Sequence, residues 1–294
     1  MIGRLLSVIF IVMILVRPSY SAQSTITEAE GSACMGDDKS RKQTEDSALM
    51  EAKRKTIEFT STYIRSETKI KNFTLEKDLL SAYGHSEVKL LQEPTKEWYK
   101  DPNSGDCAKI KIKAEVLPDT AAMQRIAAQS PAITDDPSAP LSIKAWTDKK
   151  VYSSGEKVKV YIKGNKPFYA RVIYKDASGE MVQILPNPYR TDNYFNGGMM
   201  YEIPTGSDKF DLEVSPPFGE ENVIIFASSL PLGEISTEAQ GGVYQVKTQA
   251  RDLGVKTRGI KLTKRTEGAL LDISTAKPLA SEFFEDMVVV KTRK

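Results

Sequence analysis

Residues 107–116 constrain the fold more than any other part of this chain, because apolar and charged side chains alternate along them. Alternation with a period of two puts the apolar side chains on one face of an extended strand and the charged ones on the other. The apolar positions are Ala108, Ile110, Ile112, Ala114 and Val116. The pattern predicts a strand that is buried on one face, and that face needs a covering layer.

A helix that could supply this layer is predicted upstream. Ser40 is a typical N-cap residue, so we expect a long helix to begin at Arg41. A second helix over residues 75–83 and a strand over 87–92 would complete a small α+β domain spanning residues 23–118. The buried stripe of the long helix is expected to consist of Ala48, Leu49, Ala52, Thr56, Phe59 and Tyr63.

The chain changes character after this predicted domain. Residues 119–140 contain three prolines and few large apolar side chains, which predicts a Pro-rich linker with a short helix over 120–129. Residues 141–294 alternate short β-patterned runs with Gly, Pro and Asn turns, a pattern typical of a β-sandwich-like domain. Near its end we expect a helix over 240–253 and a closing strand over 287–290. The predicted fold class is α+β, in two domains.

The first 21 residues resemble a secretory signal peptide. Arg4 precedes an uncharged apolar run over residues 5–16, which is too short to span a bilayer, and small residues follow at a cleavage position. The alternative is an uncleaved N-terminal anchor. Residues 1–21 contain two arginines and no acid, so their removal brings the formal net charge of +2 to zero. We expect a periplasmic or extracellular protein that has no stable membrane span after cleavage and binds no nucleic acid, since nucleic-acid binding needs a basic surface.

The chain has two cysteines, Cys34 and Cys107. Export to an oxidising compartment favours a disulfide bond between them, and two unpaired thiols are the alternative. The single histidine, His85, argues against His-based metal clusters and Ser-His-Asp triads. We therefore assign no catalytic, cofactor-binding or metal-binding residues, and we expect a protein that is not an enzyme.

Two surface features are candidates for binding. The segment 189–198 has three aromatics and an arginine, and Tyr and Arg are typical interface anchors; Tyr189, Arg190, Tyr194 and Phe195 are its candidate residues. The alternative is that Tyr194 and Phe195 fold back to cap the sandwich. The second feature is a basic patch that could meet lipopolysaccharide, another anionic glycan or an acidic partner, unless it is simply a solvated strand face. Its residues are Lys256, Arg258, Lys261, Lys264 and Arg265.

An ordered set of motifs resembles a family of bacterial secreted domains known as domain of unknown function 4384. The resemblance covers roughly residues 150–230, with Ile184 fitting the family pattern only loosely. It implies an extracytoplasmic, β-rich accessory domain, and the family brings no established catalytic residues. The motifs are YSSGEKVKV at 152–160, PFY at 167–169, DASGE at 176–180, VQILPN at 182–187, GG at 197–198, YEIP at 201–204 and FDLEVSPPFGEE at 210–221.

Residues 23–118 are similar, at the level of pattern, to the small α+β modules of outer-membrane lipoproteins and flagellar outer-membrane proteins. Together these features predict a secreted, non-enzymatic accessory or interaction protein of the bacterial cell envelope, which binds a protein partner through residues 189–198. One alternative is an envelope-associated hydrolase or its regulator that uses carboxylates such as Glu220 and Glu221. Another is a cell-wall glycan-binding module that uses the same aromatics.

Overall fold

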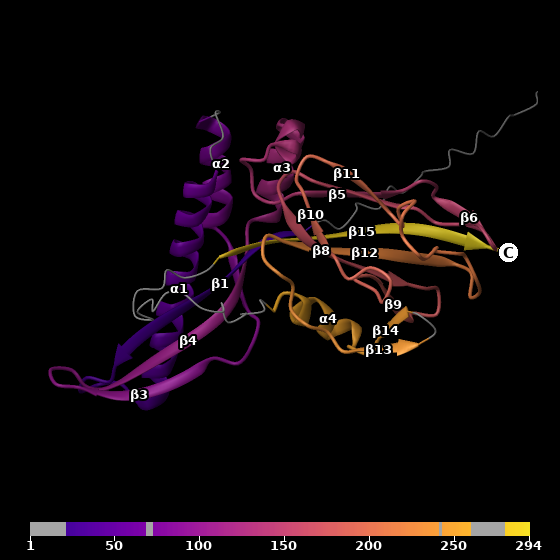
Figure 1. Ribbon diagram of the computed structural model, residues 1–294. Helices are drawn as coiled ribbons and strands as arrows, with labels where there is room; N and C mark the ends of the chain where they lie inside the picture. Colours follow the sequence, from indigo (N-terminus) through magenta and orange to yellow (C-terminus); the bar gives the residue numbers. More distant parts are fainter. Residues whose placement is uncertain (1–21, 69–72, 241–242, 260–279) are drawn as a thin grey trace, which may run out of the picture.

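The computed structural model describes residues 22–68, 73–240, 243–259 and 280–294. The predicted signal peptide, residues 1–21, lies outside the described residues. The described chain has a mixed α+β fold, in which helices flank one twelve-stranded and one three-stranded sheet (Figure 1). The helices are α1 (Arg41–Glu67), α2 (Phe73–Gly84), α3 (Thr120–Gln129), the 3-10 helix η1 (Pro131–Asp135) and α4 (Ala250–Thr257).

The large sheet follows the main path β13-β14-β9-β8-β12-β15-β1-β4-β2, while β10 pairs with β8, β3 with β4, and β6 with β15. The small sheet has the order β11-β7-β5. The strands of the large sheet are β1 (Ala22–Cys34), β2 (Glu87–Leu90), β3 (Thr95–Asp101), β4 (Gly105–Leu117), β6 (Val151–Ser153), β8 (Phe168–Lys175), β9 (Met181–Leu185), β10 (Tyr194–Phe195), β12 (Glu220–Ser228), β13 (Thr237–Gln240), β14 (Val243–Val246) and β15 (Ser281–Arg293). The strands of the small sheet are β5 (Ile143–Thr147), β7 (Val160–Gly164) and β11 (Met200–Ile203).

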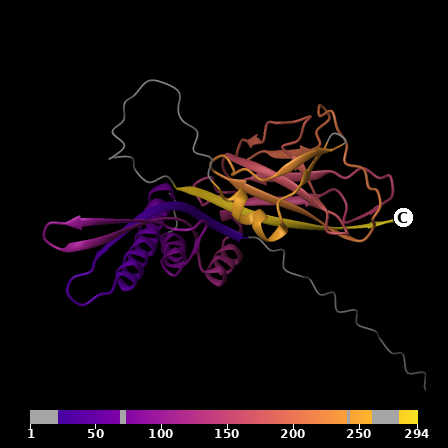
Figure 2. The same cartoon turned by 90° about the horizontal axis from the view of Figure 1, so that it is seen from below.

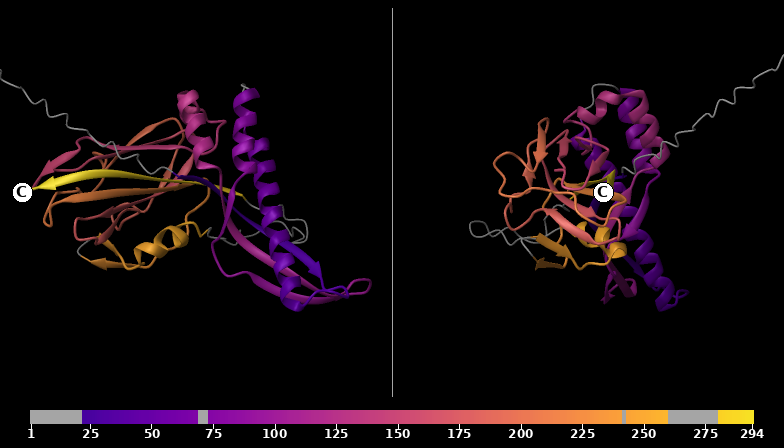
Figure 3. Two further views of the ribbon diagram at one scale, coloured as in Figure 1. Left: turned by 180° about the vertical axis from the view of Figure 1, so that it is seen from behind. Right: turned by 90° about the vertical axis from the view of Figure 1, so that its right-hand side faces the viewer.

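The predicted strand and long helix are present and pack on each other. Ser40 caps α1 in a capping box with Gln43. The buried stripe repeats every fourth residue, and it differs from the predicted one because Leu49, Phe59 and Tyr63 are only half-buried. Its residues are Thr44, Ala48, Ala52, Thr56, Thr60 and Ile64. Small side chains on this stripe let α1 lie close against β1 and β4 (Figure 3).

Strand β1 is the main element that the sequence pattern did not predict. It pairs antiparallel with β4 on one side and with β15 on the other. Because β15 also pairs with β12, one sheet runs from residues near the N-terminus to the C-terminal half of the chain. Figures 1 and 2 show β15 passing along both halves of the molecule.

The short helix predicted over residues 120–129 is present as α3, within the stretch predicted as a linker. The side chain of Asp119 caps α3 by accepting a hydrogen bond from the N–H of Ala122 at 2.7 Å. Ile126 of α3 is buried in a cluster with Leu79 and Val116, so the helix packs on the N-terminal half of the fold. The predicted helix over residues 240–253 is wrong, because Gln240 belongs to β13, Val243–Val246 form β14, and only the positions from Ala250 on enter α4.

The largest core lies between the two sheets. Inward-facing side chains of β5 and β7 pack on those of β8, β12 and β15, including Ile162, Phe168 and Val223. A second cluster lies on the opposite face of the large sheet, where Phe226 and Phe283 pack with Leu253 of α4. The large sheet is thus covered on both faces around β8, β12 and β15. None of the helices in the described part of the chain has the length and apolar character needed to cross a bilayer.

Glu282 ties elements from both halves together. Its carboxylate lies 3.1 Å from Nζ of Lys166, accepts a hydrogen bond from the hydroxyl of Tyr63 at 3.3 Å, and also accepts one from the N–H of Leu141. Burial, followed by the charge of Glu282, raises the pKa of Tyr63 well above its usual value. The tyrosine therefore remains a hydrogen-bond donor to this carboxylate throughout the physiological pH range.

Asp286 offers a pH-dependent test of the core. Burial raises the pKa of its carboxyl, although the N–H of Met287 donates to it at 2.8 Å. In the unfolded chain this carboxyl ionises near pH 4, whereas in the folded protein it ionises only at higher pH. Above about pH 4 the carboxyl therefore lowers the free energy of unfolding. We expect Asp286→Asn to increase the free energy of unfolding near pH 7 and to lose this advantage below about pH 4, where the carboxyl is protonated in both states. Urea unfolding at both pH values measures this, and a variant less stable than wild type near pH 7 would contradict it.

Candidate interaction surface

The segment after β9 is shaped by a buried asparagine. Asn187 is 4% exposed, and its carboxamide oxygen accepts hydrogen bonds from the N–H groups of Tyr189 and Arg190, both at 2.8 Å. Its amide nitrogen donates to the carbonyl of Ile184 at 2.7 Å. The turn that carries Tyr189 is thus fastened directly to the end of a core strand.

The side chain of Arg190 points inward and fixes the position of residues 189–198. Its guanidinium lies 3.1 Å from the carboxylate of Asp208 and 5.5 Å from the centre of the Phe195 ring. Both partners of this ion pair are largely buried, and Asp208 also accepts a hydrogen bond from the N–H of Thr205 at 2.7 Å. Arg190, one of the four predicted partner-binding residues, therefore joins two loops and offers little surface to a partner.

Phe195 is a core residue. It is 1% exposed, stacks on Phe168 with ring centres 5.2 Å apart, and meets the edge of Tyr201. The alternative in which this part of the segment folds back on the sandwich therefore holds for Phe195. Gly197 lies so close to the backbone of Lys166 that a Cβ atom would come within 2.4 Å of its Cα, which fixes the path of the chain here.

Four large side chains within residues 189–200 remain exposed, two in the predicted segment and two directly after it. Tyr194 lies next to Phe195 on β10 but points the opposite way, where it contacts Tyr169. Tyr189 stacks on Phe210 with ring centres 6.4 Å apart. The exposed fractions are 52% for Tyr189, 45% for Tyr194, 55% for Met199 and 60% for Met200. We call these four side chains the exposed loop surface; the sequence predicted the two tyrosines, whereas the two methionines lie beyond the predicted segment.

The predicted basic patch is only partly visible. Lys261, Lys264 and Arg265 lie outside the described residues, and Lys256 is exposed at the end of α4. Arg258 faces inward instead of joining a surface patch. Its Nε lies 2.6 Å from Glu115, its Nη2 lies 2.7 Å from Glu285, and its guanidinium covers the ring of Phe283.

The predicted disulfide is confirmed. Cys34 at the end of β1 and Cys107 in β4 face each other across paired strands and are bonded. The bond closes the end of the β1–β4 ladder against which α1 packs. It lies in the N-terminal half of the chain, outside the segment that carries the exposed loop surface.

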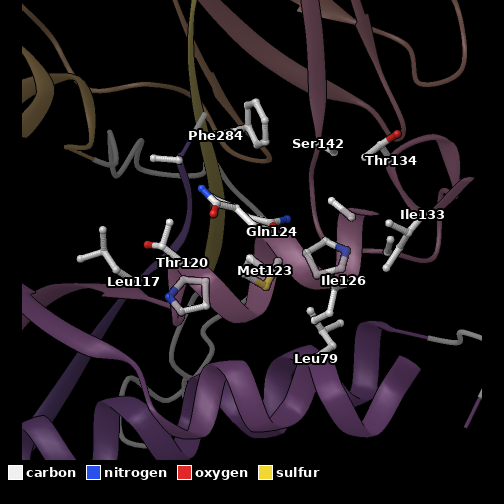
Figure 4. Close-up of a pocket in the computed structure, with 16 residues that line it drawn as sticks. Leu79, Leu117, Thr120, Met123, Gln124, Ile126, Ile133, Thr134, Ser142 and Phe284 are labelled. Carbon is white, nitrogen blue, oxygen red and sulfur yellow. The ribbon is translucent and has the colours of Figure 1, made fainter. Parts of the chain in front are cut away.

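An apolar cavity of about 430 Å³ opens beside α3 (Figure 4). Leu79 of α2, Met123 and Ile126 of α3, and Phe284 of β15 project toward it. None of its lining residues is an acid, a base or a histidine. This cavity could accept an apolar group, and it holds no titratable side chain that would act on one.

A smaller groove of about 300 Å³ lies between β9 and residues 211–217. Glu221 lies at its floor, 1% exposed, where it accepts hydrogen bonds from the hydroxyls of Tyr174 and Thr292. Burial, followed by the hydrogen bond to Glu221, raises the pKa of Tyr174 above its usual value. In the described part of the chain, no group of three or more His, Cys, Asp or Glu residues is placed to hold a metal ion.

The described chain is a β-rich protein with an added helical layer, and four exposed aromatic or methionine side chains fall within residues 189–200. Residues 151–231 match the model of a family described as Domain of unknown function (DUF4384), which confirms the predicted resemblance. The exposed loop surface and the groove around Glu221 are both built mainly from this segment. No curated protein and no solved structure matched the chain.

Proposed function

We propose that this protein is an exported, non-enzymatic accessory protein of the bacterial cell envelope, and that it binds a protein partner through the exposed loop surface. The observation that carries the proposal is the exposure of Tyr189, Tyr194, Met199 and Met200 within residues 189–200, a stretch in which Arg190 and Phe195 are turned inward. Aromatic and methionine side chains are enriched at protein interfaces. Here they are presented to solvent without being needed to fill the core.

Preorganisation of the loop supports this proposal. Asn187, the Arg190–Asp208 ion pair and Phe195 hold the backbone in one conformation. A surface that is already ordered loses less conformational entropy on binding than a flexible loop would. The disulfide and the resemblance of residues 1–21 to a signal peptide support the proposed compartment. The proposal keeps residues 23–118 and 141–294 as two units, which associate through β1 and β15.

The two alternatives have weaker support. Glu220 and Glu221 are neighbours on β12, so their side chains point to opposite faces of the sheet and do not form the pair of carboxylates that a hydrolase would use. A glycan-binding module would expose ring faces for a sugar. Tyr189 stacks on Phe210 with ring centres 6.4 Å apart, and the ring of Tyr194 lies 5.1 Å from that of Tyr169, so each of these rings already has an aromatic neighbour and offers less free face.

Replacing Tyr189 and Tyr194 together by alanine tests the proposal. We expect capture of the envelope partner to weaken by about tenfold or more, because interface tyrosines often contribute more than 1 kcal/mol each. The melting temperature should change little, since both rings are about half exposed. Partner capture from native envelope material and thermal unfolding measure the two effects.

Tyr99 provides the matched control, because it is an exposed tyrosine on β3, far along the chain from the loop. Tyr99→Ala should leave capture unchanged. Phe195→Ala should instead lower the melting temperature by about 10 °C, since truncating a buried phenylalanine costs about 3 to 5 kcal/mol. A large loss of stability in the double tyrosine variant, or unchanged capture, would contradict the proposal.

A further inference from the structure

The groove around Glu221 is a second candidate binding site, distinct from the exposed loop surface. One wall is the β8–β9 hairpin, and the other is the segment 211–217. The floor is mainly apolar and comes from several core strands. The lining residues are Val158, Val160, Tyr174, Asp176, Glu180, Val182, Ile184, Asp211, Leu212, Glu213, Val214, Ser215, Pro216, Pro217, Glu221 and Val223.

Both walls of the groove are held by hydrogen bonds. The N–H of Val158 donates to the backbone carbonyl of Leu212 at 2.8 Å, and the N–H of Val214 donates to the backbone carbonyl of Glu156 at 2.9 Å. On the other wall, the carboxylate of Asp176 accepts hydrogen bonds from the N–H groups of Ser178 and Glu180, both at 2.9 Å. The groove is therefore preformed, and binding would not have to order its walls.

The charged residues that line the groove are all acidic. Five of its lining residues are acids, and none is a lysine, an arginine or a histidine. Asp211 pairs with Lys157 at 2.7 Å just outside the groove, and both side chains are exposed. Glu221 at the floor is held by two hydroxyl groups and has no cationic partner among its hydrogen bonds. A cationic ligand would thus meet a complementary field.

We infer that this groove binds a short peptide segment of a partner protein, with an apolar side chain on the floor and lysine or arginine side chains at the acidic rim. The apolar floor around Val182 and Ile184 accounts for the first part, and the rim carboxylates account for the second. A volume of about 300 Å³ is at the lower end for ligand sites, so it has room for a few side chains only. This size fits a peptide segment better than the face of a folded domain.

The probe for this inference is a fluorescently labelled peptide of alternating leucine and lysine, with a leucine–glutamate peptide as its counterpart. We expect the basic peptide to bind the full-length protein and the acidic one not to bind. The rim variant combines Asp211→Asn with Glu213→Gln and should weaken binding about fivefold, as well as reduce its salt dependence. Val182→Trp, which fills the groove, should weaken binding by at least as much.

The control variant makes the same change of charge elsewhere. It combines Glu93→Gln with Glu97→Gln, two exposed acids in the N-terminal half, and should bind the peptide as wild type does. Tyr194→Ala should also retain binding, which separates this inference from the proposed function of the loop. The inference would be overturned if the control variant lost as much binding as the rim variant. It would also be overturned if spermidine competed as effectively as the unlabelled peptide, because either result would mean that binding depends on charge alone. Absence of peptide binding would also overturn it.

Discussion

Gly31→Ala is expected to lower the free energy of unfolding by about 3 kcal/mol or more, although it adds a single methyl group. A Cβ atom at Gly31 would lie 2.1 Å from the carbonyl oxygen of Ala48 and 2.3 Å from the backbone nitrogen of Ala52. These are backbone atoms of α1, so no side chain can rotate away to relieve the clash. The helix would have to move off β1, and the packing of its Ala and Thr stripe would be lost along with it.

Thermal or urea unfolding of this variant measures the effect. Gly84→Ala is the matched control, because nothing lies within 4 Å of a Cβ atom built at the end of α2. The control should unfold like wild type or slightly later. A Gly31→Ala variant as stable as the control would contradict the close contact between α1 and β1.

Arg258→Met is expected to destabilise the fold by about 3 to 5 kcal/mol, or roughly 10 °C in melting temperature. The substitution retains an apolar side chain to cover Phe283 but leaves Glu115 without its cationic partner. Glu115 is 4% exposed, and within the described residues the hydroxyl of Ser24 would still donate to its carboxylate, at 2.6 Å. A buried carboxylate that loses its ion pair retains the cost of desolvation without the compensating attraction.

Adding Glu115→Gln to Arg258→Met tests this reason. The double variant removes the unpaired charge, so we expect it to recover a substantial part of the lost stability. Chemical unfolding of wild type, both single variants and the double variant gives the coupling energy. Additive effects of the two substitutions would show that Arg258 does not stabilise the fold through its ion pair with Glu115.

Local patterns predicted β4 and α1, although the predicted one-sided burial of β4 is wrong in its second half, where Lys113 and Glu115 are buried as well. The alternating residues of β4 and the Ser40 cap of α1 both indicate their structure without knowledge of the partner element. The hairpin of β8 and β9 is also local, since a short turn joins two apolar runs. The pairing of Cys34 with Cys107 was predicted from the expected oxidising compartment, because no local pattern around either cysteine indicates it.

The pairing of distant strands could not be predicted in this way. β1 buries hydroxyl side chains such as Ser24, Thr25 and Thr27, so it lacks a conspicuous apolar face. Its position is set by β15, whose pairing with β1 joins the two ends of the described chain. Such a contact depends on the tertiary fold, and no short window of sequence contains both strands.

Two of the four residues of the exposed loop surface, Tyr189 and Tyr194, were predicted from the sequence. Tyr194 and Phe195 are adjacent on a strand, so alternation requires that only one of them faces the core. Their order along the sequence does not say which one, because that depends on the position of Phe168 in the neighbouring strand. Arg190 points inward because it pairs with Asp208, which lies 18 positions further along the chain.

Site-specific photo-crosslinking in intact cells tests the proposed function most directly. A photoreactive phenylalanine analogue placed at Tyr189 or Tyr194 keeps an aromatic side chain on the exposed loop surface, and the same analogue at Tyr99 serves as the control. The proposal predicts one discrete crosslinked envelope protein from both loop positions and none from position 99. Crosslinking that is equal at all three positions, or that occurs at position 99 alone, would contradict a partner-binding role for this loop.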